Sequence, residues 1–535
     1  MNKRKSGILL HPISLPSPYG IGDLGESAKA FIDYLKKADQ RLWQILPLGH
    51  TGYGDSPYQS FSAFAGNPLL ISPDILLKKG YIEESDLASH PQFDEHKIKY
   101  DRVINFKNEL LRKASKNFQK LIKSKEKTAA SAKRAYNKFC KENADWLDDY
   151  ALFISVKNHL IEERQDDLGS SEYKKFRRAN LRSLGESRLN DFYYGAFITS
   201  WPEGLANRDP DTMKSWAKIL KEDIDFYKFC QFEFFEEWIE IKKYANKNHV
   251  EIIGDIPIFV SADSADVWAN KSLFSLDSKG KMTEVAGVPP DYFSQTGQLW
   301  GNPLYNWQAH KKTGYKWWIK RISNLLKLVD IVRIDHFRAF ESYWSIPYGS
   351  ETAINGKWKK GPNKDLFEAI RKELGDLPII AEDLGDLNKE VGELRDELGL
   401  PGMKILQFAF SYEGNDYLPH TYKTSNCVVY TGTHDNDTTL NWYKTLSDKE
   451  RDYLRRYLNI NGEDVCWDMI RLAFSTVADT VIIPLQDVLK LDGSARMNTP
   501  GVSTGNWQFR YTSDMLTDES AKGLAYFSKL FNRNN

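Results

Sequence analysis

Eight short apolar runs, spread along the whole chain and each ending in polar or turn residues, constrain the fold most strongly. Their Ile, Val and Leu residues follow one another without polar alternation, which is typical of strands buried on both faces of a parallel sheet. The runs are GILL (7–10), LWQILPL (42–48), VEIIGDIPI (250–258), LVDIVRID (328–335), LPIIAED (377–383), GMKILQF (402–408), NCVVYTGTHD (426–435) and TVIIPLQD (480–487). Helical patterns such as 26–38 and 314–327 lie between most of them. This alternation predicts an α/β protein with one (β/α)₈ TIM barrel over 1–535, and a doubly wound open sheet is the alternative.

The spacing of these runs is uneven, and two long intervals contain no barrel-like strand. Residues 75–225 are mostly helical in pattern, and residues 259–327 are rich in Gly, Pro, Asn and aromatic residues. Because long structureless loops are rare in compact domains, we predict that both intervals are insertions into βα connections of the barrel.

The charge balance and the cysteine pattern limit the possible partners and compartment. The chain has 73 Lys and Arg against 73 Asp and Glu, so no basic surplus exists for binding nucleic acid. None of the four cysteines forms a C-x-x-C pair, and no apolar run approaches the roughly 20 residues of a membrane span. The apolar run near the start, four residues long, is shorter than a signal peptide needs. We therefore expect a cytoplasmic protein without nucleic-acid or membrane partners.

Acidic residues stand at the carboxyl ends of four predicted strands, where the active site of such a barrel lies: Asp255, Asp335, Glu382 and Asp435. Arg333 shares a strand face with Asp335, and we expect their pairing to lower the pKa of Asp335, which suits a nucleophile. Glu382 ends a strongly apolar strand, and burial there should raise its pKa, which suits a general acid.

Metal and nucleotide chemistry have no local support in the sequence. His11, His50, His336 and His434 lack the spacings of a zinc site, and neither G-x-G-x-x-G nor a Walker motif occurs. We therefore predict no metal and no cofactor. Two carboxylates flanking one bond are instead the arrangement for glycosyl transfer or hydrolysis.

The aromatic share of 13% also fits a carbohydrate substrate, because sugar rings lie flat on aromatic side chains. Candidate platforms are Tyr58, Tyr292, Phe293 and Trp300. The last three lie in a stretch whose Gly and Pro content fits an exposed loop, where core packing does not readily explain several aromatic residues.

Longer segments resemble a known family. VRIDHFRAF, IIAEDLG and TGTHDND are similar to the strand ends of the α-amylase clan. Within that clan, HPISLPSPYGIGDLG, LWQILPLGHTGYGDSPYQSFSAFAGNP, GDIPIFVSADSADVW and VAGVPPDYFSQTGQLWGNPLYNW resemble the 4-α-glucanotransferases (amylomaltases or disproportionating enzymes) of glycoside hydrolase family 77. The resemblance extends from about Gly7 to about Asn506.

The resemblance implies roles for individual residues. Asp335 matches the nucleophile, Glu382 the general acid/base and Asp435 a third carboxylate that binds sugar hydroxyls. The implied substrate-binding residues are Ser56, Tyr58, Asp255, Trp300, Asn302, Arg333 and His434. Residues 285–303 match a loop that covers the cleft.

The implied activity is transfer of an α-1,4-glucan segment, from maltooligosaccharides, starch or glycogen, to the 4-hydroxyl of glucose or another glucan. The implied mechanism is a retaining double displacement. We expect the protein to be a monomer or a homodimer. Two alternatives remain at this point: a hydrolytic α-amylase-type enzyme of the same clan, and a catalytically silent glucan-binding barrel.

Overall fold

The computed structural model describes residues 4–88, 90–125, 127–163, 201–290, 294–385, 388–502 and 504–534. Each of the eight apolar runs forms a strand, and the eight strands make one sheet in which every hydrogen-bonded pair is parallel. The strands are β1 (Lys5–Leu9), β2 (Leu42–Gln44), β3 (Glu251–Ile256), β6 (Ile331–Ile334), β9 (Ile379–Ala381), β10 (Gly402–Ile405), β11 (Cys427–Tyr430) and β12 (Thr480–Pro484). Their spatial order, β10-β11-β12-β1-β2-β3-β6-β9, follows the chain cyclically, without the order reversal of a doubly wound sheet. The predicted TIM barrel is confirmed.

The barrel closes between β9 and β10 through the last residue of β9 and residues that follow it. The Ala381 amide donates to the carbonyl of Pro401 at 3.0 Å, and the Met403 amide donates to Asp383 Oδ1 at 2.7 Å. Gly402 permits this approach, since a Cβ there would lie 2.4 Å from Asp383 Oδ2. The short β9 thus places Glu382 at the seam of the barrel.

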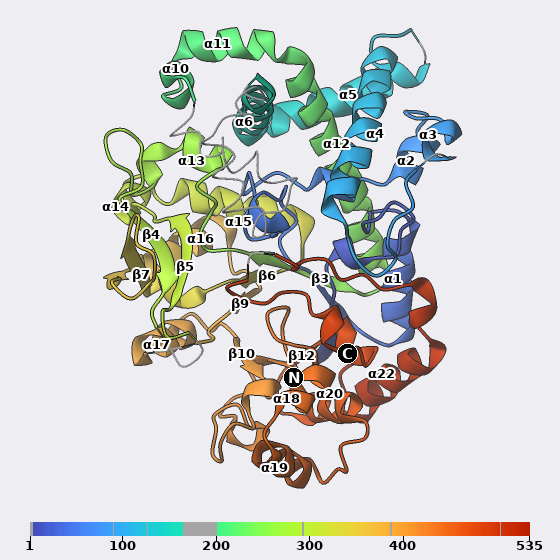
Figure 1. Ribbon diagram of the computed structural model, residues 1–535, viewed down its shortest axis with the longest axis vertical. Helices are drawn as coiled ribbons and strands as arrows, with labels where there is room; N and C mark the ends of the chain where they lie inside the picture. Colours follow the sequence, from blue (N-terminus) through green and yellow to red (C-terminus); the bar gives the residue numbers. More distant parts are fainter. Residues whose placement is uncertain are drawn as a thin grey trace, which may run out of the picture.

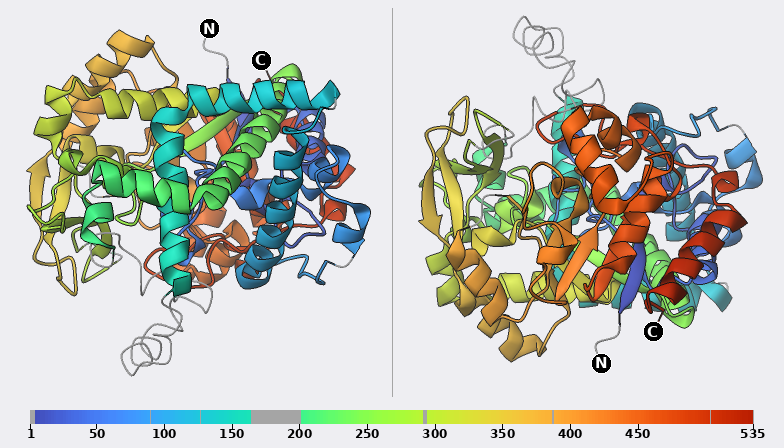
Figure 2. Two further views of the ribbon diagram at one scale, coloured as in Figure 1. Left: turned by 90° about the horizontal axis from the view of Figure 1, so that it is seen from above. Right: turned by 90° about the horizontal axis from the view of Figure 1, so that it is seen from below.

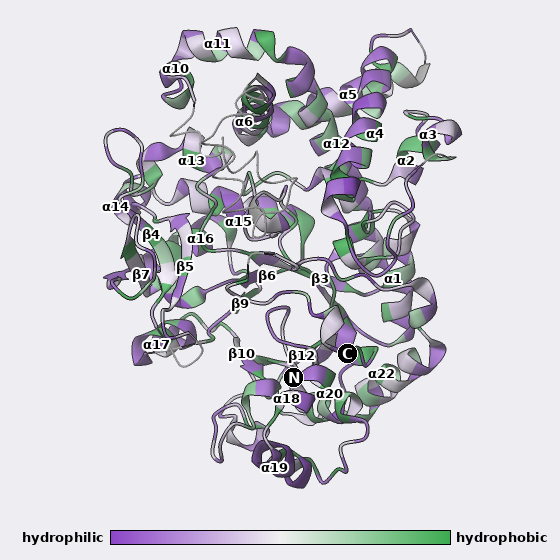
Figure 3. Ribbon diagram, in the orientation of Figure 1, coloured by the Kyte–Doolittle hydropathy of each residue, from purple (hydrophilic) through white to green (hydrophobic). Residues whose placement is uncertain are grey.

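Helices surround the barrel and follow most of its strands (Figure 1). Those in or near the βα connections are α1 (Glu26–Lys37), α14 (Trp307–Lys312), α15 (Lys316–Leu328), α16 (Lys364–Leu374), α17 (Lys389–Glu397), α18 (Thr439–Thr445), α19 (Asp448–Leu458), α20 (Val465–Ser475), α21 (Leu485–Val488) and α22 (Asp518–Leu530). Figure 3 shows α19 as strongly hydrophilic, in agreement with a sequence that buries only Leu454.

Helices also make up most of the described residues of the long connection from β2 to β3. They are α2 (Pro73–Lys78), α3 (Glu84–Ala88), α4 (Tyr100–Leu121), α5 (Lys127–Glu142), α6 (Ala144–Glu163), α10 (Glu203–Ala206), α11 (Pro210–Ile219) and α12 (Lys221–Lys247). Residues 164–200 of the predicted insertion lie outside the described residues. Seen from above, the cyan and green helices of this connection lie across one side of the barrel (Figure 2, left).

The long helix α12 joins these helices to the barrel. Near its middle, Phe229 packs against Phe118 of α4 with ring centroids 5.1 Å apart. Further along, Trp238 packs against Trp43 of β2 and donates its indole N–H to the carbonyl of Leu328 at 2.8 Å. One hydrophobic core therefore extends from the helical connection into the barrel.

A small antiparallel sheet stands beside the barrel, in the order β5-β4-β7-β8 (Figure 1). Its strands are β4 (Glu284–Val288), β5 (Gln298–Pro303), β7 (Ser342–Pro347) and β8 (Lys357–Lys360), and the short helix α13 (Ala265–Ala269) precedes it in the chain. The range 285–303, expected to be a loop, thus contains an antiparallel strand pair. Tyr292 and Phe293 lie outside the described residues.

A search of the described helices found none with both the length and the apolar content to cross a membrane.

Candidate active site

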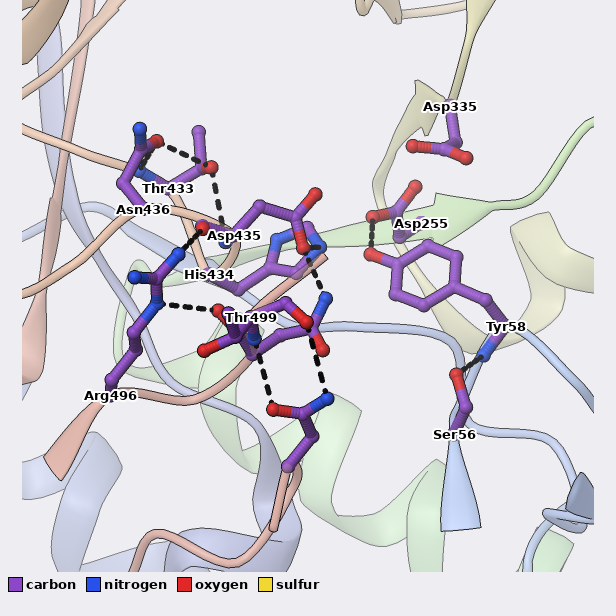
Figure 4. A network of polar contacts seen from close by, with 12 residues as sticks. Ser56, Tyr58, Asp255, Asp335, Thr433, His434, Asp435, Asn436, Arg496 and Thr499 are labelled. Atoms are coloured by element: carbon purple, nitrogen blue, oxygen red, sulfur yellow. Dashed lines mark hydrogen bonds and ion pairs between the residues drawn. The ribbon is translucent and has the colours of Figure 1, made fainter. Parts of the chain in front are cut away.

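Four elements bring the predicted acidic residues to one end of the barrel. Asp255 lies within β3, Asp335 and Glu382 directly follow β6 and β9, and Asp435 lies in the turn after β11. Because carboxyl ends of parallel strands meet at one rim, strand alignment alone collects these side chains. Figure 4 shows Asp255 and Asp335 side by side, with Asp435 approaching them from the opposite side.

Arg333 links two of these carboxylates. Its Nη1 donates to Asp255 Oδ1 at 2.8 Å, to Asp255 Oδ2 at 2.6 Å and to Asp335 Oδ1 at 3.1 Å. The shorter contacts go to Asp255, its register partner on the neighbouring strand β3. The side chains of Arg333 and Asp255 are buried, and that of Asp335 is 27% exposed. The expected contact of Arg333 with Asp335 is present, but a second carboxylate shares the guanidinium.

The pKa of Asp335 departs from the prediction. Burial raises this pKa well above its usual range, the charge of Arg333 opposes the rise, and the neighbouring carboxylates of Asp255, Glu382 and Asp435 add to it. Arg333 does act to lower the pKa of Asp335, as predicted, but the net shift is upward, so the expected low pKa of Asp335 is wrong. The physical reason is that several carboxylates share one cation in a desolvated site.

Glu382 has the properties of a general acid. Burial raises its pKa to about 6, although the charge of Arg333 and two backbone hydrogen bonds act in the opposite direction. The amide of His336 donates to Glu382 Oε2 at 2.6 Å, and the amide of Leu384 donates to Oε1 at 3.0 Å. The predicted rise is confirmed. Arg333 contacts Asp335 directly and makes no hydrogen bond to Glu382, so a proton shared by the two acids is favoured on Glu382.

Sequence reasoning missed the part that His336 plays in this geometry. Its backbone is left-handed, with φ of 51°, and this conformation turns its amide toward Glu382. The ring of Trp300 packs edge-on against the imidazole at 4.8 Å. A non-glycine residue in this conformation next to a nucleophile candidate is the kind of strained position that occurs at active sites. In the sequence, the only indication of this role was the position of His336 directly after Asp335.

Tyr58 lies beside Asp255, and His434 lies beside Asp435 (Figure 4). Their rings stack with centroids 5.3 Å apart and an interplanar angle of 11°. The Tyr58 hydroxyl donates to Asp255 Oδ2 at 2.8 Å, and burial raises the pKa of this tyrosine well above its usual value. Burial lowers the pKa of His434 and the charge of Asp435, whose Oδ1 lies 3.4 Å from Nε2, opposes this shift. The structure thus connects Tyr58 to Arg333 through Asp255.

Ser56, Asn302 and Trp300 lie in segments that border the site. The Ser56 hydroxyl accepts the Tyr58 amide hydrogen at 3.2 Å. The Asn302 amide donates to the carbonyl of Val260 at 2.9 Å and accepts from Gln59 at 3.2 Å, so both ends of this buried side chain hold loops together. Trp300 is half-buried. Within the described part of the chain, no group of three or more His, Cys, Asp or Glu side chains is arranged to hold a metal ion.

Comparison with known protein families identifies the family of this chain. A family model described as 4-alpha-glucanotransferase matches residues 10–198 and 172–517. The chain belongs to the 4-alpha-glucanotransferase family. Relatives of that name occur in Synechocystis sp., with 46% identity over 100% of this chain and 99% of the relative, and in Thermus thermophilus, with 43% identity over 97% of each.

Solved structures agree with this family assignment. The amylomaltase of Streptococcus agalactiae, in complex with acarbose, superposes with a TM-score of 0.89 at 37% identity and full coverage of both chains. The amylomaltase of Corynebacterium glutamicum has a TM-score of 0.71 at 15% identity, covering 99% of this chain and 75% of its own, and it supports the fold alone. The family model, the full-length relatives and the fold thus agree on membership of this family.

Proposed function

We propose that this 4-alpha-glucanotransferase transfers a segment of an α-1,4-glucan to the 4-hydroxyl of glucose or of another glucan by retaining double displacement. The observation that carries this proposal is the pairing of two acids with different environments. Burial raises the pKa of both acids, to about 6 for Glu382, but only Asp335 lies against the guanidinium of Arg333, which favours its ionised form. Pairs of carboxyl groups with such contrasting surroundings divide the roles of nucleophile and acid.

In the first step, protonated Glu382 gives its proton to the glycosidic oxygen as that bond breaks. Asp335 attacks the anomeric carbon and forms a β-glucosyl-enzyme, while Asp435 and His434 hold hydroxyls of the donor sugar. The two backbone N–H groups on Glu382 then stabilise the carboxylate that remains after proton transfer.

In the second step, anionic Glu382 removes the proton from an acceptor 4-hydroxyl, and that oxygen displaces Asp335. Two inversions at one carbon restore the α configuration. A retaining mechanism predicts that the two carboxyl groups lie about 5–5.5 Å apart, compared with about 6.5–9.5 Å in an inverting enzyme.

Transfer prevails over hydrolysis only if the acceptor sugar displaces water from the glucosyl-enzyme. Trp300, on β5 of the small sheet, packs on His336, whose amide holds Glu382. This ring therefore lies against the residue whose backbone amide holds the acid/base. We propose that Trp300 and the β4–β5 segment exclude water and orient the acceptor.

Incubation with maltotriose tests the proposal. We expect glucose together with a ladder of longer maltodextrins, and the number of reducing ends stays constant because each transfer creates one and consumes one. Glucose and maltose alone, with one new reducing end per cleavage, would indicate the hydrolytic alternative. Binding of maltooligosaccharides without any product would indicate the silent barrel. The cytoplasmic location and the monomeric or homodimeric state stay predictions.

A further inference from the structure

The carboxylate of Asp435 is held by residues 496–499, which follow β12 and are distant in sequence from the turn that carries Asp435. Asn498 Nδ2 donates to Asp435 Oδ1 at 2.6 Å, and the Asn498 amide donates to the carbonyl of His434 at 3.1 Å. Arg496 Nη2 donates to the carbonyl of Asp435 at 2.7 Å, and its Nε donates to the carbonyl of Asn498 at 2.8 Å. Figure 4 shows Arg496 beside the turn that carries Asp435.

We propose that Asn498 and Arg496 are positioning residues that orient the Asp435 carboxylate for the transition state, an inference that rests on the proposed function. Asn498 Nδ2 and His434 Nε2 both approach Oδ1 of this carboxylate. Within the described part of the chain, Oδ2 receives no hydrogen bond. Fixing one oxygen in this way leaves the other directed to the hydroxyls of the donor sugar.

Packing alone does not fix this side chain. The Asp435 side chain is 46% exposed, and the surrounding turn borders an open pocket that Thr433, His434, Asn436 and Arg496 help to line. The Asn436 side chain accepts from the amide and hydroxyl of Thr433 at 2.9 Å, which shapes the turn but does not contact the carboxylate. The orientation of Asp435 therefore depends on Asn498.

Residues 496–499 are themselves held by hydrogen bonds to Asn506 and Trp507. Asn506 accepts from the Thr499 amide at 2.9 Å and donates to the carbonyl of Val502 at 2.7 Å. The Trp507 amide donates to the carbonyl of Met497 at 2.7 Å, and its ring packs against Tyr58 at 5.8 Å and His434 at 6.1 Å. The segment can thus hold Asp435 at a defined position relative to the stacked Tyr58 and His434 rings. Arg496 also has an ion-pair partner in Asp437, 3.8 Å away.

Kinetics with maltotriose provide the first test. Because a displacement of about 1 Å can cost about 100-fold in rate, we expect Asn498→Ala to lower kcat by roughly 30-fold. Arg496→Lys, which keeps the charge but cannot bridge two carbonyls, should lose less activity than Arg496→Ala. Val502→Ala, at a 49% exposed side chain just after residues 496–499, is the matched control and should keep wild-type kcat.

The pH dependence separates positioning from general damage. Asn498→Asp has nearly the same shape, but its carboxylate repels Asp435 and regains a donor when it is protonated. The ratio of wild-type to variant kcat should therefore fall by about 10-fold between pH 8 and pH 5. A ratio of wild-type to variant kcat that is constant with pH would contradict the proposal that Asn498 orients Asp435.

A double-mutant cycle on acarbose affinity gives the decisive result, since binding remains measurable in slow variants. Isothermal titration would compare the wild type, Asn498→Ala, Asp435→Asn and the double variant. If Asn498 acts through Asp435, Asn498→Ala should weaken binding clearly in the wild type and less than about 2-fold in the Asp435→Asn background. Equal weakening in both backgrounds would overturn the proposal. Wild-type ladder formation reports on the proposed function separately, so the two failures are distinguishable.

Discussion

Replacing Arg333 with Met tests whether this guanidinium holds the site together electrostatically. The variant keeps a side chain of similar length but leaves Asp255 buried without a cation, since Arg333 Nη1 contacts both oxygens of Asp255 at 2.8 and 2.6 Å. Breaking a buried ion pair by removing one partner costs about 3–5 kcal/mol. At an unfolding entropy of about 2.1 cal/mol/K per residue, a chain of 535 residues would lose about 3–4.5 °C in melting temperature.

The assay is thermal unfolding followed by circular dichroism, with maltotriose transfer measured in parallel. We expect the double variant Arg333→Met/Asp255→Asn to regain about 2 kcal/mol relative to the single variant, because the unpaired carboxylate is gone. Transfer activity should not return, since Asp335 still lacks its cation. Arg456→Met is the control: its side chain is 71% exposed, and its pair with Asp452 should contribute less than about 0.5 kcal/mol.

A double variant as unstable as Arg333→Met would refute this reasoning, because the loss would then come from packing of the arginine and not from the stranded charge. Full stability of Arg333→Met itself would refute it equally, by showing that Asp255 needs no cation.

Three further predictions concern the catalytic groups. Asp335→Asn should lower transfer by at least about 1000-fold while calorimetry still detects maltooligosaccharide binding, and wild-type turnover would exclude Asp335 as the nucleophile. Because Glu382 must be protonated to act and has a pKa of about 6, kcat/KM should fall about tenfold per pH unit well above pH 6. A flat profile from pH 6 to pH 8 would contradict that role. Trp300→Ala should raise hydrolysis relative to transfer several-fold, measured as new reducing ends against ladder products, and an unchanged ratio would remove Trp300 from acceptor control.

Much of the fold was predictable because its signals are local. Each barrel strand is a short continuous apolar run, and the polar residue at its end is visible in the sequence, as for Asp335 after VRI and Glu382 after IIA. Parallel strands in a closed barrel place such residues at one rim, so their convergence followed from the strand pattern. The strand pair within 285–303 was harder to predict from the sequence, since its Gly and Pro residues are typical of loops.

The sequence by itself determined the barrel, the four acidic residues at its strand ends and, through long motifs, the family. The tertiary structure decided how these residues affect one another. It made Asp255 the principal partner of Arg333, raised the pKa of Asp335 where the local pair predicted the opposite, and brought Asn498 to Asp435 across 63 positions of the chain. The physical reason is that burial and hydrogen bonding between distant segments depend on barrel closure, which no short stretch of sequence encodes.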